Sequence, residues 1–459
     1  MKKSFIATAV LFCTAAVVFA GPMKKATPVA PKKAPAPVVQ KKASAPRKAA
    51  PAPRSAPVVA RPAPALPASG GGYRPAGTLA FANLETIAQA VAGIAGPKSS
   101  DVVLKTLVPN AIRGQLCAKL FGPMRPGTPG VAVCYVDPAI AARVAASKRA
   151  HEADVTRGQR WSVVYPTSLP KAEFMRRNPE AVPEANGSLR VPPGRLARQS
   201  VWVWFSSDGQ WAVQAPSPSM AAHAFSASAG ARMRPLGPNL AIMRMDASGT
   251  RALFGSDLFA NGELTIRMTP LGLELRGSAQ RIQMKRPPLP APARSLAGVP
   301  ANATLFGVTT TPSDIHMAED LFALAGPEFG GYVRNSLKLL EQPGTTTLYL
   351  DQPGAPAVGL APRARLAKIL PESQTNPVAA NSLFCSPTTV LRLGLPKVAA
   401  KMMPMDSVQL HVALRLLRNA RGDGMGAMSW HDGTVDRLLV RISRDELYGT
   451  ANLWSMLFL

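Results

Sequence analysis

One local pattern recurs along the chain and constrains its fold more than any other feature. Two apolar segments flank a polar turn, and a residue suited to capping a helix follows. Residues 201–205 lead into the turn 207–209 (Ser-Asp-Gly), and 211–214 return. Ser217 or Ser219 then stands where it would cap the next helix. Such turn residues between apolar segments predict a β-hairpin followed by a helix.

The same pattern appears again near the C-terminus. Residues 426–430 and 435–442 flank the turn 431–433 (His-Asp-Gly). Ser443 and Glu446 follow with the spacing of a capping box, in which each side chain satisfies a free backbone N–H group of the other residue. We therefore expect a second hairpin and a final helix here.

A weaker third copy lies between these two. It predicts a hairpin of 347–350 with 357–360, a turn at 352–354 and a helix over 363–370. A further hairpin, turning at 270–272, is expected between 264–268 and 273–276.

A second recurring unit is a short apolar strand, a corner rich in Asp, Ser, Thr and Pro, and a helix. The corner residues are typical of the first turn of a helix. The strands of this unit are expected at 131–136, 240–245, 305–308 and 383–385.

Residues 283–299 are rich in proline and interrupt this order, so they are expected to form a linker. The patterns on either side predict two tandem α+β domains, 78–282 and 300–459. Each would be an antiparallel sheet with helices packed on one face.

The first 20 residues have the pattern of a secretory signal peptide. Two lysines precede an apolar run over 5–19, and Val18-Phe19-Ala20 has the small-residue spacing of a cleavage site. We therefore expect an exported protein, either periplasmic or extracellular.

Residues 21–77 are expected to form a disordered, basic stalk, because they contain 13 prolines, 11 Lys or Arg residues and no acidic residue. The stalk is either a solvated linker or a tether to an anionic envelope polymer or membrane surface. No aromatic residue precedes Tyr73, so a specific nucleic-acid partner is not indicated. The paired cations of this predicted tether are Lys24, Lys25, Lys32, Lys33, Lys41, Lys42, Arg47 and Lys48.

Charge and hydropathy set further bounds on residues 78–459. They hold 40 of the 53 Lys and Arg residues and all 26 acidic residues, so their formal net charge is about +14. This favours anionic partners. After the signal peptide no apolar stretch is long enough to predict a membrane-spanning helix. Cys117 and Cys134 are expected either to form a disulfide or, with Cys385, to be buried thiols.

No motif predicts a catalytic residue, a cofactor or a metal site. Ser168 and Lys171 have the spacing of serine acylases, but Pro170 lies between them and the partner motifs are missing, so Ser168 is expected to cap a helix. The strongest candidate for a ligand is the strand 201–205, which is apolar on both faces. Trp202 and Trp204 share one face, which either packs in the core or lines a groove for a lipid or another hydrophobic ligand.

The segments Trp161-Ser162-Val163-Val164-Tyr165-Pro166 and Gly209-Gln210-Trp211-Ala212-Val213, the second followed by a Ser/Pro-capped helix, give the region 160–250 a resemblance to a loose group of proteins. These are exported, repeat-built α+β bacterial proteins of unknown function. The resemblance implies the fold and the export, and it implies no catalytic residue.

The sequence as a whole favours a non-enzymatic envelope protein with a binding or scaffolding role, tethered by its stalk. One alternative is a carrier of a hydrophobic ligand in a concavity of the sheet. A second is a hydrolase that uses a histidine base among His151, His223, His316, His411 and His431.

Overall fold

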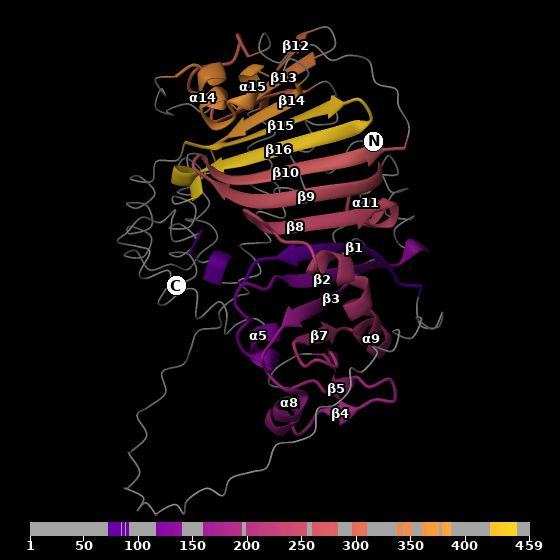
Figure 1. Cartoon of the computed structure of the whole chain (residues 1–459). Coiled ribbons are helices and arrows are strands. Elements are labelled where there is room, and N and C mark those ends of the chain that lie inside the picture. Colours follow the sequence, from indigo (N-terminus) through magenta and orange to yellow (C-terminus); the bar gives the residue numbers. More distant parts are fainter. Residues whose placement is uncertain are drawn as a thin grey trace, which may run out of the picture.

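The chain forms one antiparallel sheet of 16 strands (Figure 1). The computed structural model describes residues 72–83, 85–87, 89–90, 116–139, 159–194, 199–254, 259–282, 296–309, 337–342, 345–350, 360–375, 379–386 and 423–447. The strand order is β12-β13-β11-β14-β15-β16-β10-β9-β8-β1-β2-β3-β7-β6-β5-β4. The predicted mixed α+β class with an antiparallel sheet is confirmed.

The N-terminal half of the sheet ends in the hairpin of β9 and β10. Its strands are β1 (Arg74–Phe81), β2 (Gly130–Val136), β3 (Gln159–Pro166), β4 (Val182–Pro183), β5 (Leu189–Val191), β6 (Val201–Phe205), β7 (Trp211–Ala215), β8 (Asn239–Asp246), β9 (Phe259–Thr269) and β10 (Gly272–Arg281). Its helices are α5 (Leu116–Phe121), α8 (Lys171–Arg177), α9 (Pro218–Ala227), α10 (Ala229–Arg232) and α11 (Ala247–Phe254).

The C-terminal half ends in the hairpin of β15 and β16. Its strands are β11 (Leu305–Thr309), β12 (Leu337–Gln342), β13 (Thr345–Leu350), β14 (Ala379–Cys385), β15 (Met425–Asp432) and β16 (Val435–Ser443). Its helices are α14 (Pro362–Ile369) and α15 (Glu372–Thr375). The two halves meet where β10 pairs with β16.

The two halves repeat one strand order about this junction. Counting outward, β10-β9-β8-β1 corresponds to β16-β15-β14-β11. The next strands, β7 and β6, then correspond to β13 and β12, once the inserted pair β2 and β3 is set aside. The chain passes through the corresponding strands in the same order, and a helix joins β7 to β8 as another joins β13 to β14.

The register of the junction has the symmetry of a local two-fold axis. Gly272 and Val435 each begin a strand after a two-residue turn, so aligning them places Gln280 on Ser443. The ladder pairs Gly272 with Ser443 and Gln280 with Val435, which exchanges the equivalent positions. The axis passes between Arg276 and Leu439, which pair with each other.

A β-bulge recurs at the same place in both halves. The register shifts between Asn239 and Ala241, opposite β9, and between Ala379 and Asn381, opposite β15. A bulge adds an unpaired residue and bends its strand, so it marks a defined position in a sheet. Its recurrence places β8 and β14 in equivalent roles.

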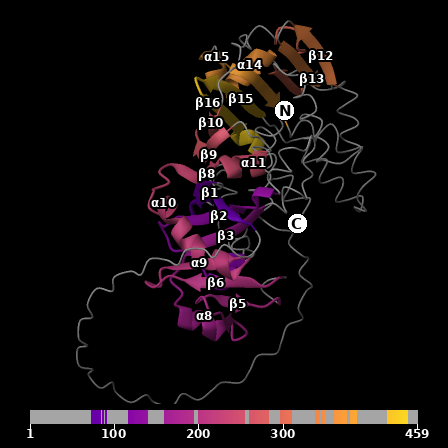
Figure 2. The same cartoon turned by 90° about the vertical axis from the view of Figure 1, so that its right-hand side faces the viewer.

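The described helices lie on both faces of the sheet (Figure 2). We call face A the one that contains Val164 and Val213, against which α9 packs through Met220. The opposite face, face B, contains Val203 and packs against Phe174 of α8. The expectation of helices on one face is therefore not confirmed, because successive residues of a strand point to opposite faces and both are apolar here.

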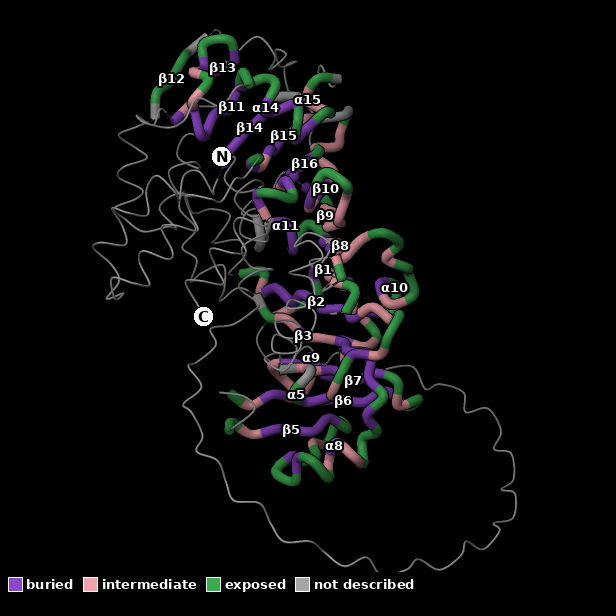
Figure 3. The backbone as a smooth tube through the Cα atoms, turned by 90° about the vertical axis from the view of Figure 1, so that its left-hand side faces the viewer, coloured by how far each residue is buried: buried purple, intermediate pink, exposed green. Residues whose placement is uncertain are grey.

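The core follows the strands (Figure 3). Every residue of β2 is buried, as expected of a strand covered on both faces. Leu275, Leu438 and Val440 on face B lie beside the junction of the halves and are about 1% exposed. The predicted linker segment contributes as well, since Leu296 and Val299 pack in the core of the C-terminal half.

Most local predictions are confirmed. The hairpins β6–β7, β9–β10 and β15–β16 form as expected. Ser217 caps α9 by accepting a hydrogen bond from the Met220 amide at 3.3 Å, and Asp246 accepts one from Gly249 in α11 at 2.9 Å. Helix α14 lies where the third copy predicted it.

Other local predictions are wrong. Strand β13 does not form a hairpin with 357–360, because β12 and β11 occupy both of its edges. Pro170, not Ser168, precedes α8. Strand β1 begins at Arg74, inside the segment predicted to be the stalk, because it pairs with β2 from that residue on.

Shortening a side chain at the junction tests its contribution to stability. We expect Leu438→Ala to lower the free energy of unfolding by about 2–5 kcal/mol, because it leaves a cavity in a close-packed core. Leu271→Ala is the control, since Leu271 is 45% exposed in the β9–β10 turn, and it should cost less than about 0.5 kcal/mol. Urea unfolding followed by tryptophan fluorescence measures both, and equal losses would contradict this assignment of the core.

Candidate functional site

The most highly charged site among the described residues lies on face A at the junction of the two halves. Glu274 of β10 is 1% exposed and pairs directly with Arg441 of β16, which is 4% exposed. Both occupy strand positions whose neighbours in sequence point to the apolar face B. The local pattern of β10 (Leu-Glu-Leu-Arg) places the carboxylate on face A.

Three arginines converge on the Glu274 carboxylate. Arg267 of β9 and Arg276 of β10 each approach Oε1 to 2.6 Å, and Arg441 donates to Oε2. Each contact joins a guanidinium to a carboxylate, which makes it stronger than a hydrogen bond between neutral groups. One buried carboxylate therefore connects three strands of the sheet.

Helix α15 contributes a second carboxylate to the cluster on face A. Glu372 takes two hydrogen bonds from Arg441, at 2.8 and 2.9 Å, in a bidentate arrangement. Arg441 also donates to the backbone carbonyl of Ile369 at 2.8 Å. Glu372 is partly exposed and reaches to within 3.7 Å of Arg276. We call Arg267, Glu274, Arg276, Glu372 and Arg441 the junction cluster.

The cluster holds its carboxylates in the charged form. Burial by itself raises the pKa of Glu274, but hydrogen bonds from Arg276, Arg441 and Arg267 outweigh it and lower the pKa to about 2. The pKa of Glu372 is also lowered, because its bonds to Arg441 outweigh its burial. Both groups are therefore anionic at neutral pH.

The predicted ligand face near the β4 end of the sheet consists of packed aromatic side chains, unlike the charged junction cluster. Trp202 and Trp204 lie half-buried on face A beside α9, and Trp204 packs on Phe225 with ring centroids 5.1 Å apart. Arg232 lies 3.7 Å from the centroid of Phe225 and 5.0 Å from that of Trp211. These contacts agree with the core interpretation. A hydrophobic ligand at Trp202 and Trp204 stays a prediction.

The remaining predicted site residues are placed as follows. The eight stalk cations lie outside the described residues. Cys117, Cys134 and Cys385 are free thiols, which agrees with the second alternative for the cysteines. Burial raises the pKa of the Cys117 and Cys134 thiols to about 12, so neither is a ready nucleophile.

Among the histidines proposed as a catalytic base, the structure describes a side-chain contact for His223. The His223 ring lies on α9 with Nδ1 3.3 Å from the Tyr135 hydroxyl. Burial lowers the pKa of His223 and raises that of Tyr135 above its usual range. The pair is therefore neutral, and the phenol is a poor nucleophile. His151, His316 and His411 lie outside the described residues.

The described part of the chain contains no group of three His, Cys, Asp or Glu side chains placed to hold a metal ion. None of its helices has the length and hydropathy needed to cross a membrane.

Comparison with known proteins identifies no family for this chain. No family model and no curated protein matches the sequence. Among solved structures, the chain is similar to crystal form I of TP0453, with 10% identity over 66% of this chain and 95% of that one. The TM-score is 0.23, which is too low to establish a shared fold.

Sequence reasoning missed the junction cluster. The local signal was present, since Arg267, Glu274 and Arg276 fall on one face of a correctly predicted hairpin. Their partners Glu372 and Arg441 belong to the other half of the chain. Only the pairing of β10 with β16 brings them together.

Removing the central carboxylate tests the cluster. We expect Glu274→Gln to lower the free energy of unfolding by about 3–5 kcal/mol, because buried guanidinium groups lose their counter-ion. Glu263→Gln is the matched control, since Glu263 pairs with Arg244 at a partly exposed position and should cost less than about 1 kcal/mol. Chemical unfolding at neutral pH distinguishes the two, and similar losses would show that the buried carboxylate has no special role.

The cluster should also make stability depend on pH. The pKa of Glu274 is about 2 in the folded protein, below its value of about 4.3 in an unfolded chain, so the unfolded state binds more protons between these values. The free energy of unfolding should therefore fall as the pH drops from about 5 to 2, and fall less in Glu274→Gln. Urea midpoints across this range measure the difference, and parallel curves would contradict the assignment.

Proposed function

We propose that this protein is an exported, non-enzymatic component of a cell envelope that binds or scaffolds anionic envelope material. The observation that carries the proposal is the single 16-stranded sheet. With strands about 4.8 Å apart, it spans roughly 70 Å in one hydrogen-bonded body. A long sheet connected by continuous ladders suits the holding of partners at fixed separations.

The charge distribution supports an anionic partner. The chain carries a formal net charge of +27, and the eight paired cations between residues 24 and 48 precede the first strand in the chain. A block of cations attracts a polyanion electrostatically, so this segment would act as a tether. The signal-like pattern of residues 1–20 supports a contact in the periplasm or outside the cell.

We also infer that 78–282 and 300–459 are two copies of one α+β unit joined edge to edge. The repeated strand order, the two equivalent bulges and the two-fold register of β10 and β16 support this inference. The copies share one sheet, so they would act as one body.

The geometry favours a binding protein over a hydrolase. The described histidine pair lacks an activated nucleophile, since the Tyr135 phenol that contacts His223 has a raised pKa. In the cluster with the strongest electrostatics, the buried carboxylate of Glu274 is held by ion pairs to arginines.

Neutralising the stalk tests the tether. We expect replacement of its eight paired cations by Gln to weaken binding of the full chain to dextran sulfate by at least about tenfold at low salt, and to lower the salt dependence, because fewer counter-ions are released. The control replaces the same lysines by Arg and keeps the charge. Binding is measured in solution, and envelope association by cell fractionation. If both are unchanged by the Gln variant, the stalk is only a spacer and the tether is rejected.

A further inference from the structure

Among the described residues, no helix packs on face A over the middle strands of the sheet. Helix α10 contacts β1 and β2 on one side, and α14 contacts β15 and β16 on the other. Among the described helices, α11 contacts β8 and β9, but it lies on the opposite side of the sheet from α10 (Figure 2). Figure 1 shows no described helix on this face over β8, β9 and β10, whereas α14 covers part of β16, where Leu439 is 1% exposed.

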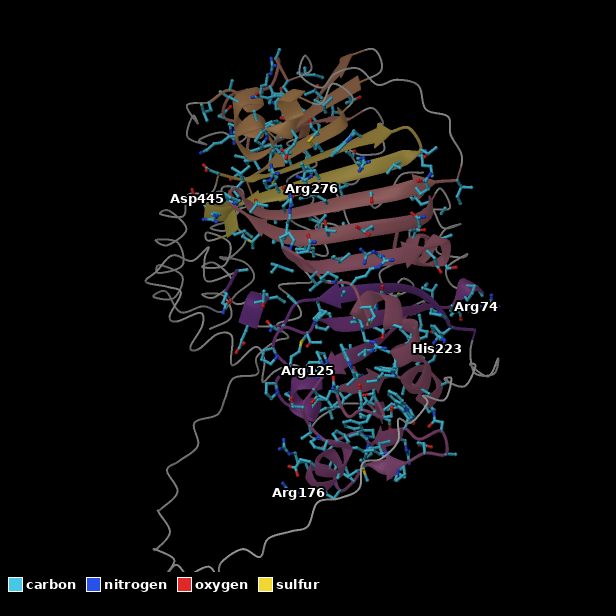
Figure 4. All side chains as sticks on the ribbon, viewed as in Figure 1. Arg74, Arg125, Arg176, His223, Arg276 and Asp445 are labelled. Carbon is cyan, nitrogen blue, oxygen red and sulfur yellow. The ribbon has the colours of Figure 1, made fainter. Side chains whose placement is uncertain are left out.

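The side chains of face A on these strands include four arginines, and Figure 4 labels one of them, Arg276. Arg244 and Arg267 are 33% exposed, Arg276 is 49% exposed, and Arg437 is exposed. Cross-strand pairing puts them on one face, because Arg244 pairs with Glu263, Glu263 with Ser278, and Ser278 with Arg437. We call this surface the arginine strip, formed by Arg244, Glu263, Thr265, Arg267, Arg276, Ser278 and Arg437 together with the buried Glu274 and Arg441.

The strip carries a net positive charge at neutral pH. Its five arginines exceed its two glutamates, and Glu372 at the border adds one more carboxylate. Glu274 holds the guanidinium group of Arg267, and Glu274 and Glu372 hold that of Arg276. These two groups therefore lose less conformational entropy when they bind an anion. The half-exposed Arg276 sits on the local two-fold axis at the centre of this surface.

We propose that the arginine strip binds an anionic polysaccharide, which lies across β8, β9, β10 and β16. This inference rests on the proposed function, since it gives the folded part its own contact with the anionic material that the stalk would reach. Guanidinium groups recognise carboxylate or phosphate groups on such a chain. The hydroxyls of Thr265 and Ser278 lie between the arginines and suit the hydroxyls of the sugar rings.

The borders of the strip favour a chain over a membrane surface. Helices packed on a sheet stand about 10 Å above it, so α10 and α14 hold a flat bilayer away from the floor. A polysaccharide is narrow enough to lie between them. The stalk would add avidity, because a second basic module on the same chain makes rebinding intramolecular.

The test measures binding of the full chain to dextran sulfate over a range of salt concentrations. Arg244→Gln with Arg437→Gln removes two charges from the strip and leaves the buried Glu274–Arg441 pair intact. The control is Arg176→Gln with Arg177→Gln on α8, where both side chains are more than half exposed. The strip variant should bind about tenfold more weakly with a shallower salt dependence, and the control should change by less than about twofold.

The same variants are compared in the wild-type and Gln-stalk backgrounds. Weaker binding of the strip variant in both backgrounds supports the proposal. If only the stalk changes weaken binding to dextran sulfate, the strip proposal fails and the tether stands. If neither set of changes weakens binding, both proposals fail. Equal losses in the strip variant and its control would reduce the effect to net charge and overturn the proposal. Loss of binding to phosphatidylglycerol vesicles with unchanged binding to dextran sulfate would also overturn it, in favour of a membrane.

Discussion

The pairing of β10 with β16 is the contact on which the rest of the sheet depends, and the buried Glu274–Arg441 pair defines it. The apolar partners on face B at this ladder, such as Leu275 with Val440, would tolerate other alignments of similar side chains. A slip of one residue would send the charges to the apolar face, and a slip of two would separate them. Either slip leaves a buried charge without its counter-ion, which costs several kcal/mol. The cluster therefore selects one register among several that hydrophobic burial would allow.

The local two-fold register at this ladder gives each residue of β10 a symmetric position on β16. The position equivalent to Glu274 holds Arg437, and the position equivalent to Arg441 holds Ser278. The two sides of the axis therefore differ. On one side Glu274 and Arg441 form a buried ion pair at the junction. On the other side Arg437 is exposed and pairs across the strands with Ser278.

Local chemistry explains which parts of the fold could be predicted from the sequence. The hairpins β6–β7 and β9–β10 have turn glycines with positive φ, Gly209 at 67° and Gly272 at 140°. A side chain at Gly272 would collide with the Ile442 carbonyl, so the residue type and the pairing agree. Ser217 and Asp246 likewise fix helix starts through bonds to residues three positions away. All of these signals lie within a few residues of the element that they determine.

Non-local pairing explains what could not be predicted. The turn 352–354 resembles a hairpin turn, yet β13 pairs with β12, the strand immediately before it in the chain, and with the more distant β11. The capping box at Ser443 was half right, since Ser443 accepts from the Glu446 amide at 3.1 Å. The Glu446 carboxylate, however, takes the Gly424 amide at 3.0 Å. In both cases at least one partner lies outside the local motif, β11 for strand β13 and Gly424 for Glu446. The junction cluster is the extreme case, because Glu274 and Arg441 acquire their roles only after two halves with equivalent edges have met.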